Sequence, residues 1–390
     1  MNNFILNTDI QQFINENLNS NSTNVLLKGT PFKTVSTSEI VLQIEAKIRC
    51  QKKLPTWFHT NGIYYPSKLN IEQTSSEITA KYKSKLIKGT HIIDVTGGFG
   101  VDCFYFSTRF KFVTHCEINA ELSKIVEHNL KQLNVANITT VVNDGIEFLK
   151  GQNNTFDWIY IDPSRRHDAK GKVFFLRDCS PNVPEHLSQL FKYSNHVMIK
   201  TSPLLDISAG IGELSCVKTV HVIAVNNEVK ELLWILEKGY NGLITIETAN
   251  IKPDITEKFQ FNWSKTVVTT NYSYPLTYVY EPNAAILKAG GFHQITDSLK
   301  VFKLHQHSHL YTSSNYIDFP GRIFTIKQVI PYNKKLVKRL GIKKANISTR
   351  NFPERVENIR KKFSIKDGGD IYLFFTTTLG NEKIVLVTVK

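Results

Sequence analysis

The sequence predicts an α/β protein with a doubly wound sheet of seven strands, a helical segment before the sheet and a smaller α+β region after it. Two observations support this fold class. From Gly89 to about residue 250, short runs rich in Ile, Val, Phe and Tyr alternate with helical stretches, which is typical of a parallel sheet. From residue 322 onward, strands and basic helices alternate in a shorter region of their own.

Residues 1–73 are expected to form a helical or lid region. Within it, Ser38–Lys47 carries apolar residues at helical spacing. Next, Thr74-Ser75-Ser76-Glu77 has the pattern of a capping box, in which the Thr74 hydroxyl caps the helix and Glu77 reaches back to the Thr74 amide. The pattern predicts a helix from there to about Leu86, with Gly89 as its C-terminal stop.

The sheet domain is expected to span residues 74–250. Its strands are predicted at 91–95, 112–116, 138–142, 157–161, 195–199, Val217–Val225 and Gly242–Thr248. Helices are predicted at Ala120–Leu133 and Glu228–Leu236.

Two further regions follow the sheet. Residues 251–321 are expected to form a polar connection and a small α/β segment, with strands at 265–269 and Thr277–Tyr280 and a helix at Asn283–Ala289. Residues 322–390 are expected to read strand, helix, strand, helix, strand, strand, at Arg322–Gln328, Asn333–Leu340, Ala345–Arg350, Pro353–Phe363, Asp370–Thr377 and Lys383–Val389.

The positive charge of the chain is concentrated in one segment. Residues 331–366 hold twelve Lys and Arg against two Glu, a net charge of +10 out of +14 for all 390 residues. Such a module indicates a polyanionic partner, most plausibly RNA or DNA. The alternative is a solvated basic face that only keeps the protein soluble.

Other features exclude several classes. The five cysteines form no C-x-x-C pair, which disfavours a disulfide framework and a zinc site, so no metal is expected. No window approaches the ~18 consecutive apolar residues of a membrane-spanning helix. The N-terminus also lacks the pattern of a secretory signal, so a cytoplasmic location without membrane contact is expected.

A glycine-rich loop follows the first predicted strand, in the segment from Ile92 to Asp102. A nicotinamide-binding G-x-G-x-x-G fingerprint that began at Gly98 would need a third glycine where Cys103 stands. Asp94 would repel a pyrophosphate but suits an ammonium group, so the loop fits a ligand with an adenosyl end and a cationic amino-acid end. The candidate ligand contacts in this loop are Asp94, Thr96, Gly97, Gly98, Phe99, Gly100 and Asp102.

Polar residues also follow the next three strands, where open α/β sheets bind ligands. Glu117, with Ile118 after it, ends the second strand and can accept both ribose hydroxyls. Asn143-Asp144-Gly145 ends the third strand and can bond an adenine amine, and Asp162 ends the fourth.

These motifs, in this order, resemble those of class I S-adenosylmethionine (SAM)-dependent methyltransferases. More closely, the chain resembles a bacterial methyltransferase family with a THUMP-like C-terminal domain. The resemblance rests on Glu72–Glu77, on Asp162-Pro163-Ser164-Arg165-Arg166 and on Tyr280-Glu281-Pro282-Asn283-Ala284-Ala285. It implies a Rossmann-like methyltransferase sheet in residues 74–250, a ferredoxin-like segment within 251–321 and a THUMP-like RNA-docking domain in 322–390. It also implies SAM as cofactor and RNA, rRNA or tRNA, as substrate.

The resemblance assigns the catalytic role to Asp162, Pro163, Ser164 and Arg165. In amino-group methyltransferases the corresponding Asp/Asn-Pro-Pro-aromatic motif accepts hydrogen bonds from an exocyclic amine, so guanine N2 or adenine N6 is expected. Ser164 and Arg165 replace the second Pro and the aromatic residue, which puts base stacking at this position in doubt. Pyrimidine C5 chemistry needs a cysteine nucleophile and is disfavoured, because Lys200–Pro203 holds no cysteine.

Two sets of basic residues are candidates for RNA contact. The first set follows the catalytic motif and comprises Arg165, Arg166, Lys170, Lys172 and Arg177. The second set lies in the basic module and comprises Lys338, Arg339, Lys343, Lys344, Arg360 and Lys361. An equally weighted alternative for the first segment is a structural loop in which Arg165 pairs with a carboxylate.

Three other functions compete with an RNA methyltransferase. A nicotinamide-dependent oxidoreductase is disfavoured by Asp94 and by the missing third glycine. A non-catalytic RNA-binding protein with a degenerate fold is disfavoured because the acidic residues of all four motifs are present. A methyltransferase of proteins or small molecules, with an incidental basic module, is the alternative least excluded.

Overall fold

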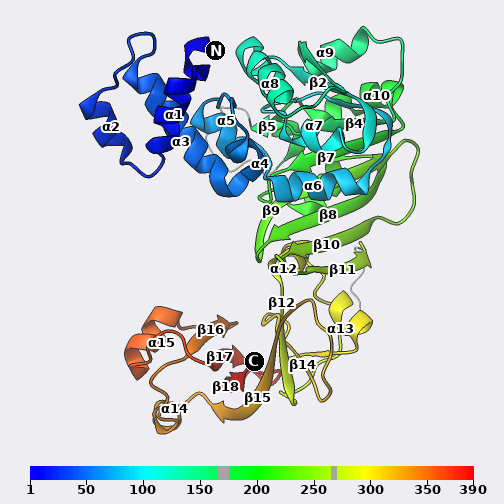
Figure 1. Ribbon diagram of the computed structural model, residues 1–390. Coiled ribbons are helices and arrows are strands. Elements are labelled where there is room, and N and C mark those ends of the chain that lie inside the picture. The colour runs from blue at the N-terminus through cyan, green and yellow to red at the C-terminus, as the bar shows by residue number, and fades with distance from the viewer. Residues whose placement is uncertain (166–174, 265–269) are drawn as a thin grey trace. The chain divides into compact units, whose positions relative to one another are not determined.

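The computed structural model describes residues 1–165, 175–264 and 270–390 (Figure 1). The chain divides into two compact units. Unit 1 comprises Met1–Val220 and Lys230–Gly242, and unit 2 comprises His221–Val229 and Leu243–Lys390.

The N-terminal segment of unit 1 is helical, as expected. It consists of η1 (Asn3–Leu6), α1 (Thr8–Glu16), α2 (Ser22–Lys28), α3 (Thr37–Lys53), α4 (Pro55–His59) and α5 (Lys68–Gln73). Ser36 caps α3 in a capping box with Glu39, whose side chain accepts a hydrogen bond from the Ser36 amide. Buried Ile10, Ile14 and Ile40 hold α1 and α3 together, because apolar residues three or four apart share one helix face.

The next helix, α6 (Glu77–Leu86), starts and stops differently from the prediction. Its N-cap is Ser76, whose hydroxyl accepts a hydrogen bond from the Thr79 amide at 3.2 Å, and not Thr74. Glu77 does not close a capping box because three other donors occupy its carboxylate: the amide and hydroxyl of Thr56 and the hydroxyl of Tyr105. The predicted stop at Gly89 is also wrong, since the helix is capped at Ile87 and Gly89 begins a strand.

An α/β sheet follows, so the predicted fold class is confirmed. Its strands are β1 (Gly89–Asp94), β2 (Phe110–Glu117), β3 (Ile138–Val142), β4 (Trp158–Ile161), β7 (His196–Thr201), β8 (Val217–Val225), β9 (Glu228–Glu237), β10 (Thr245–Ile251) and β11 (Thr256–Asn262). The intervening helices are α7 (Val101–Phe106), α8 (Ala120–Gln132), α9 (Gly145–Lys150), α10 (Val183–Tyr193) and α11 (Ile207–Glu213). Between β4 and α10 the chain forms a separate two-stranded sheet of β5 (Ser164–Arg165) and β6 (Cys179–Ser180). The short 3-10 helix η2 (Leu176–Asp178) comes directly before β6.

Among the described residues this sheet has nine strands, in the order β11-β10-β8-β9-β7-β4-β1-β2-β3, where seven were predicted. The helix predicted at Glu228–Leu236 is wrong, because this segment is β9 and pairs antiparallel with β7. Asn226 and Asn227, with φ of 50° and 66°, form the two-residue turn between β8 and β9. Consecutive positive φ values are typical of a hairpin turn that Asn tolerates, and this turn signal was missed. Strand β11 accounts for the other additional strand.

Strand register brings the predicted site residues to one edge of the sheet. Asp94 lies opposite His115 on β2 and opposite Tyr160 on β4. Ile161 lies opposite Ile199, so the residues that follow them along β4 and β7 are neighbours. Parallel strands therefore end together, and the loops after β1, β2, β4 and β7 meet at this edge.

Unit 2 contains a second sheet, of seven strands among the described residues, in the order β13-β14-β12-β15-β18-β17-β16. These strands are β12 (Tyr278–Pro282), β13 (Phe302–Lys303), β14 (Tyr311–Ser313), β15 (Gly321–Pro331), β16 (Asn346–Arg350), β17 (Ile371–Thr377) and β18 (Lys383–Val389). Its helices are α12 (Ala284–Ala289), α13 (Gln294–Leu299), α14 (Lys334–Arg339) and α15 (Val356–Phe363). The six elements predicted after residue 321 are all present, whereas the strand predicted at 265–269 lies outside the described residues.

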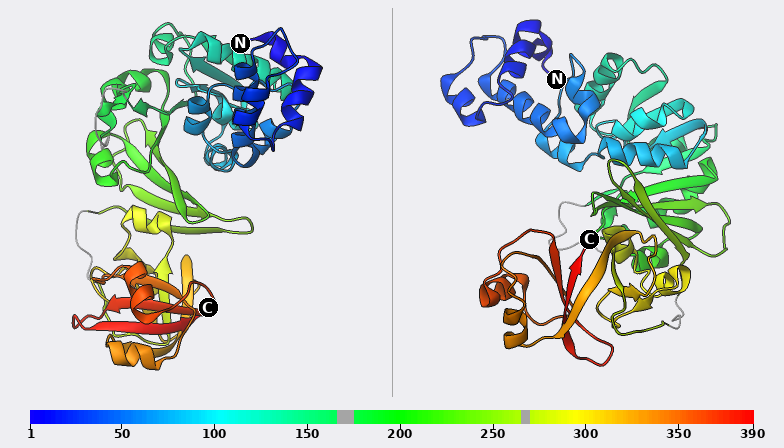
Figure 2. Two further views of the ribbon diagram at one scale, coloured as in Figure 1. Left: turned by 90° about the vertical axis from the view of Figure 1, so that its left-hand side faces the viewer. Right: turned by 60° about the horizontal axis from the view of Figure 1, so that its bottom comes forward.

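The basic helices pack on one face of this second sheet (Figure 2). Val337 of α14 and Ile359 and Phe363 of α15 are buried against sheet residues such as Leu373 and Val385. Because one stripe of each helix is apolar and buried, the charged side chains face outward.

The Tyr280–Ala285 motif is explained by packing in unit 2. Glu281 is buried and forms ion pairs with Arg322 and Arg350. Asn283 caps α12 by accepting a hydrogen bond from the Ile286 amide at 3.1 Å. The motif therefore joins the segment before residue 321 to the segment after it.

Within the described parts of the chain, no helix combines the length and the apolar character needed to cross a membrane. In the same residues, no group of three or more His, Cys, Asp and Glu side chains is arranged to hold a metal ion.

Candidate active site

The glycine-rich loop is shaped by close backbone packing. A Cβ atom on Gly97 would lie 2.4 Å from Nε2 of the buried His115. Gly100 has a φ of 76° and a Cβ there would lie 2.8 Å from a methyl group of Val126. Only glycine fits these two positions, so the loop stays close to the end of β2. There, the Gly98 amide donates to Oε2 of Glu117 at 2.9 Å.

Asp94 is a buried carboxyl with an unusual proton affinity. Its Oδ1 accepts hydrogen bonds from the amide and hydroxyl of Thr96, at 2.9 and 3.1 Å. For Oδ2, the described residues supply only the weak thiol donor of Cys103, at 3.5 Å. Burial, followed by the charges of Asp102 and Asp162, raises the pKa of Asp94 to about 7. A cation beside Oδ2 would offset this cost of ionisation, so Asp94 fits an ammonium group.

Glu117 and the residues near it fit the adenosyl end of such a ligand. Each Glu117 oxygen accepts one backbone amide, from Gly98 and from Asn119, and keeps a second lone pair for a hydroxyl. Ile118 is 71% exposed beside it, an apolar surface suited to an aromatic ring. Asp144 caps α9 through Oδ1, and its Oδ2 has no donor among the described residues, so it is open to an amine.

Four other predicted cofactor residues have different surroundings. Phe99 is buried in the core and lies beside the Trp57 ring, with 6.2 Å between ring centroids. Asn143 is exposed, and its amide donates to the Glu117 carbonyl oxygen. A Cβ on Gly145 would lie 2.3 Å from the carbonyl oxygen of Val95, so packing requires glycine there. The remaining residue, Asp102, lies in a buried ionic cluster.

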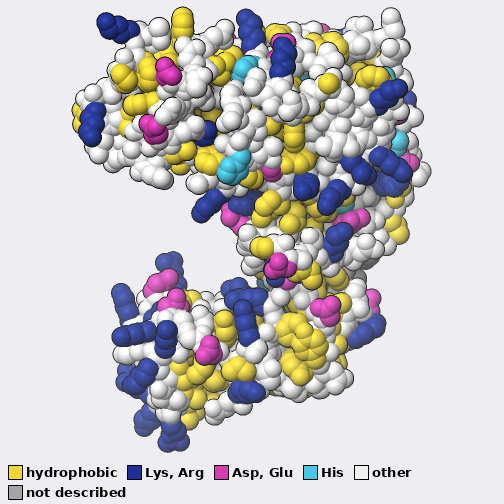
Figure 3. All heavy atoms as spheres, viewed as in Figure 1, with side chains coloured by type: hydrophobic (Ala, Val, Ile, Leu, Met, Phe, Trp, Pro, Cys, Tyr) yellow, Lys and Arg dark blue, Asp and Glu magenta, His cyan; other side chains and the backbone are white. Residues whose placement is uncertain are grey.

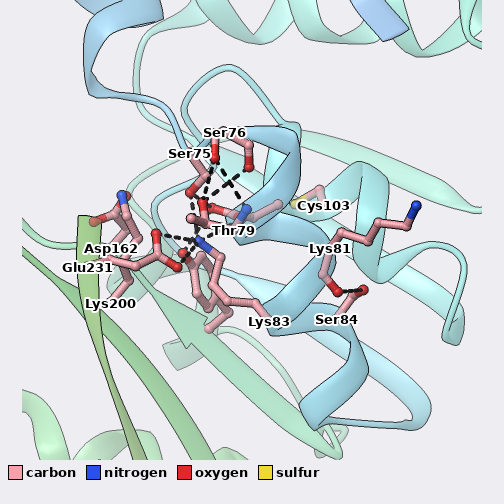
Figure 4. Close-up of polar contacts among 12 residues, drawn as sticks. Ser75, Ser76, Thr79, Lys81, Lys83, Ser84, Cys103, Asp162, Lys200 and Glu231 are labelled. Carbon is pink, nitrogen blue, oxygen red and sulfur yellow. Dashed lines mark hydrogen bonds and ion pairs between the residues drawn. The ribbon is translucent and has the colours of Figure 1, made fainter. Parts of the chain in front are cut away.

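Asp162 follows β4 and is joined to the glycine-rich loop. Its amide donates to the Thr96 hydroxyl at 2.7 Å, and the same hydroxyl donates to Asp94. One oxygen of its carboxylate, Oδ2, forms an ion pair with Nζ of Lys200 (Figure 4). The side chain of Asp162 remains 30% exposed. The structure therefore brings Asp94, Thr96 and Asp162 together as predicted from the motif order.

A small pocket of about 30 Å³ lies at the ends of β4 and β7, and Pro163, the residue after Asp162, is part of its lining. It is lined by Pro163, Phe175, Leu176, Cys179, Thr201, Ser202 and Leu205. Pro163 and Phe175 supply apolar surface, while Thr201 and Ser202 supply hydroxyls. Ser164 is exposed on β5, next to the pocket in sequence. Sequence analysis missed the pocket and Cys179, because the residues that line it come from three separate segments.

Sequence analysis also missed two lysines. Lys200 was considered only as part of a segment without cysteine. The pairing of β4 with β7 places it next to Asp162, because Ile161 lies opposite Ile199. Lys83 looks like a surface residue of α6 but is fully buried. Its Nζ lies 3.1 Å from both oxygens of Glu231 and 3.0 Å from Oδ1 of Asp102 (Figure 4).

Ser75, from the Glu72–Glu77 segment at the start of α6, contributes to this buried cluster. Ser75 donates to Oδ2 of Asp102 at 2.8 Å and accepts from Lys83 at 2.7 Å. The hydroxyl of Tyr160 donates to the same Asp102 oxygen at 2.9 Å. These contacts link Asp102 of α7 to α6 and to β4.

The candidate RNA-binding residues lie in two places. Of the set after Asp162, Arg166, Lys170, Lys172 and the side chain of Arg165 lie outside the described residues. Arg177 is exposed, and its guanidinium lies 4.4 Å from the ring centroid of Phe175 and near Glu213.

Most of the second set is exposed on or beside α14 and α15. Lys and Arg side chains gather over these helices in the space-filling view (Figure 3). Lys338, Arg339, Lys343, Lys344 and Lys361 are exposed. Arg360 differs, because its guanidinium donates to the carbonyls of Ala345 and Ile365 and pairs with Asp367. It therefore links α15 to Ala345, just before β16, and to the segment that follows the helix.

Comparison with known proteins supports the fold and the domain types. A family model described as "Conserved hypothetical protein 95" matches residues 60–175. A ferredoxin-like domain model matches residues 278–320, and a THUMP domain-like model matches residues 321–390. No curated protein matches the chain.

Three solved structures resemble the chain to different extents. A "putative methyltransferase" from Porphyromonas gingivalis W83 has a TM-score of 0.90 and 31% sequence identity, covering 99% of this chain and 98% of that chain. SMU.1697c from Streptococcus mutans, solved in complex with SAH, has a TM-score of 0.31 and 17% identity, covering 41% of this chain and 96% of its own. TrmK from M. capricolum, in complex with S-adenosyl-homocysteine (SAH), has values of 0.33 and 19%, covering 42% of this chain and 70% of its own.

The first of these similarities extends over nearly the whole of both chains. The protein therefore belongs to the family of the P. gingivalis protein and joins a class I methyltransferase fold to a THUMP-like C-terminal domain.

Proposed function

We propose that this protein is a SAM-dependent methyltransferase that modifies an exocyclic amine, guanine N2 or adenine N6, in structured RNA. The observation that carries the proposal is the carboxylate of Asp162, whose side chain is 30% exposed and whose backbone amide is linked through the Thr96 hydroxyl to Asp94.

The cofactor site follows from the donor set. Asp94 would hold the ammonium group of SAM, Glu117 would accept the ribose hydroxyls, and Ile118 and Asp144 would receive the adenine. Bound SAM supplies an electrophilic methyl group on a sulfonium. All protein groups needed for binding come from three adjacent strand ends, which agrees with the ligand position in open α/β sheets.

The acceptor site is the exposed side of the Asp162 carboxylate, next to a small pocket of about 30 Å³ that Pro163 helps to line. An exocyclic amine placed there donates a hydrogen bond to Asp162, which orients the nitrogen lone pair toward the methyl group. Orientation of this kind supplies much of the rate of a displacement reaction. Pro163 and Phe175 offer apolar surface for a flat base, which replaces the aromatic residue that the motif lacks.

The docking site is the basic face of α14 and α15. Exposed lysines and arginines on a rigid helical face suit phosphate contacts, which position a nucleic acid without reading its sequence. A THUMP-like domain with this surface supports RNA as the substrate class, rather than a protein or a small molecule.

The first test is calorimetric titration with SAM, SAH and NADH. Binding of SAM and SAH at micromolar Kd, without NADH binding, is expected. Labelled SAM is then supplied with RNA from a strain that lacks the gene, and label is expected in RNA from that strain but not from its parent. Binding of NADH alone would contradict the proposal, and label in protein instead of RNA would contradict the assigned substrate.

A further inference from the structure

Lys200 is placed to act on the carboxylate of Asp162. It lies on β7, and the pairing of Ile161 with Ile199 sets it beside Asp162. Its ammonium contacts Oδ2 of Asp162, and its side chain is 12% exposed. For Oδ1 of Asp162, the described residues include no donor. One oxygen of the carboxylate is therefore held, and the other is open toward solvent and the pocket.

A buried group of charges lies behind Lys200. Glu231 of β9 and Asp102 of α7 are bridged by the ammonium of Lys83 (Figure 4). Burial alone would lower the pKa of Lys200, but the carboxylates of Asp162, Glu231 and Asp102 outweigh it and raise that pKa well above its usual range. Lys200 is consequently an ammonium at every physiological pH.

We propose that Lys200 is the positioning residue of the methyl-transfer centre: it holds Asp162 by one oxygen, leaves the other for the acceptor amine, and neutralises the carboxylate charge. Glu231, which pairs with Lys83, adds negative charge near Lys200 and so helps to keep it an ammonium. The inference rests on the proposed function and extends it to a residue outside the four motifs.

The charge of the pair leads to a measurable consequence. SAM carries one more positive charge than SAH, because only SAM has a sulfonium. With Lys200 in place the pair is neutral and adds little preference for either ligand. Without Lys200, an unpaired Asp162 carboxylate would attract SAM over SAH. At protein dielectric values, unit charges several ångströms apart correspond to roughly a tenfold change in affinity.

The test compares the ratio of the SAM and SAH dissociation constants in four proteins. Lys200→Met should shift the ratio roughly tenfold toward SAM, and Asp162→Asn should shift it toward SAH. The double variant removes both charges, so its ratio should return to within about threefold of wild type. The matched control is Lys218→Met, which breaks the exposed ion pair with Glu237 and should leave the ratio unchanged.

Methyl transfer to RNA from the deletion strain gives the second readout. Lys200→Met and the double variant should both lose at least a hundredfold in kcat, an estimate taken from typical losses on misplacing a reacting group. Lys200→Arg keeps the charge and should recover at least tenfold of the loss in Lys200→Met. SAH affinity within about threefold of wild type shows that a variant is folded. If Lys200→Met fails this check, the ratio of the SAM and SAH dissociation constants is compared between wild type, Asp162→Asn and the double variant.

Failure of the proposed function and failure of this inference give different results. Wild-type protein that binds neither SAM nor SAH overturns both. Wild-type binding together with an unchanged ratio in Lys200→Met, or with undiminished transfer, overturns only the role of Lys200.

Discussion

At the scale of single residues, the candidate site contains two carboxyl groups with different surroundings, Asp94 and Asp162. Asp94 is buried, and its pKa rises to about 7, first because of burial and then because of Asp102 and Asp162. Asp162, the residue directly after β4, stays partly exposed and paired with Lys200. Two carboxylates at the ends of neighbouring strands thus differ in environment, which suits the separate roles proposed for them in cofactor binding and in acceptor orientation.

Replacing Asp94 by Asn should stabilise the ligand-free protein at pH 8. The folded pKa of about 7 exceeds the ordinary value of 3.8, so stability falls as the pH rises through this window and stays low above it. Asn cannot ionise, so Asp94→Asn should gain roughly 2–4 kcal/mol over wild type at pH 8 and little at pH 4. Urea unfolding at the two pH values measures the difference.

The same substitution should abolish SAM binding. Asp254→Asn, at an exposed position, is the matched control for loss of one carboxylate. Equal stability of Asp94→Asn and wild type at pH 8 would show that Asp94 is not a destabilising buried charge.

Cys179 provides a test of the type of chemistry. It lines the pocket beside Pro163, and a cysteine there is what pyrimidine C5 methylation would require as its nucleophile. Because an exocyclic amine needs no covalent intermediate, Cys179→Ser should keep kcat within about threefold of wild type. A loss of a thousandfold in a labelled-SAM assay would instead assign C5 chemistry. Cys216→Ser serves as the control outside the pocket.

At the scale of elements, α14 and α15 show how a helix combines packing with charge. Their buried stripes include Val337 and Ile359, and their outer faces carry the exposed lysines. Arg360 belongs to neither group, because its hydrogen bonds hold the neighbouring loop. Charge counting alone could not make this distinction, since it depends on the carbonyl groups that the fold brings to the guanidinium.

Reversing the charge of three exposed lysines should weaken RNA binding and leave SAM binding unchanged. In Lys343→Glu/Lys344→Glu/Lys361→Glu, RNA affinity should fall at least tenfold in about 0.1 M salt. The slope of log affinity against log salt should become shallower by roughly 2–3. Fluorescence anisotropy across a salt series measures both.

The control for that variant changes three exposed lysines of unit 1, as Lys28→Glu/Lys33→Glu/Lys52→Glu. The same loss of affinity in both variants would mean that net charge, and not this helical face, drives binding.

At the scale of the whole molecule, the chain contains two compact units with separate cores. Every residue proposed to contact SAM belongs to unit 1, so SAH should stabilise only that unit. At about 100 times its Kd, SAH should raise the melting temperature of unit 1 by roughly 2–4 °C in calorimetry. The transition of unit 2 should not move, and equal shifts in both would contradict this assignment.

Much of this arrangement could be predicted from the sequence, for a physical reason. Asp94, Glu117 and Asp162 each stand at or directly after the end of a predicted strand, and parallel strands end at one edge, so the local pattern was enough to place them together. The helix predicted for β9 failed because the two-residue turn at Asn226-Asn227 was not recognised as a hairpin signal.

The lysines of the site could not be found in that way. Lys83 and its partner Glu231 are separated by 148 positions, and nothing local marks either residue as buried. The contacts that make Lys83 and Lys200 important form only when the sheet is complete, so they follow from tertiary packing and not from periodicity.

The complete burial of Lys83 has a practical consequence for following the protein in solution. An amine-reactive reagent reaches Lys83 only when α6 separates from the sheet, while exposed amines such as that of Lys218 react at once. The rate of covalent labelling at Lys83, read by peptide mass spectrometry, therefore measures how often unit 1 opens around α6. Repeated with SAM and with RNA, the measurement reports how each ligand changes the opening of the sheet around Lys83.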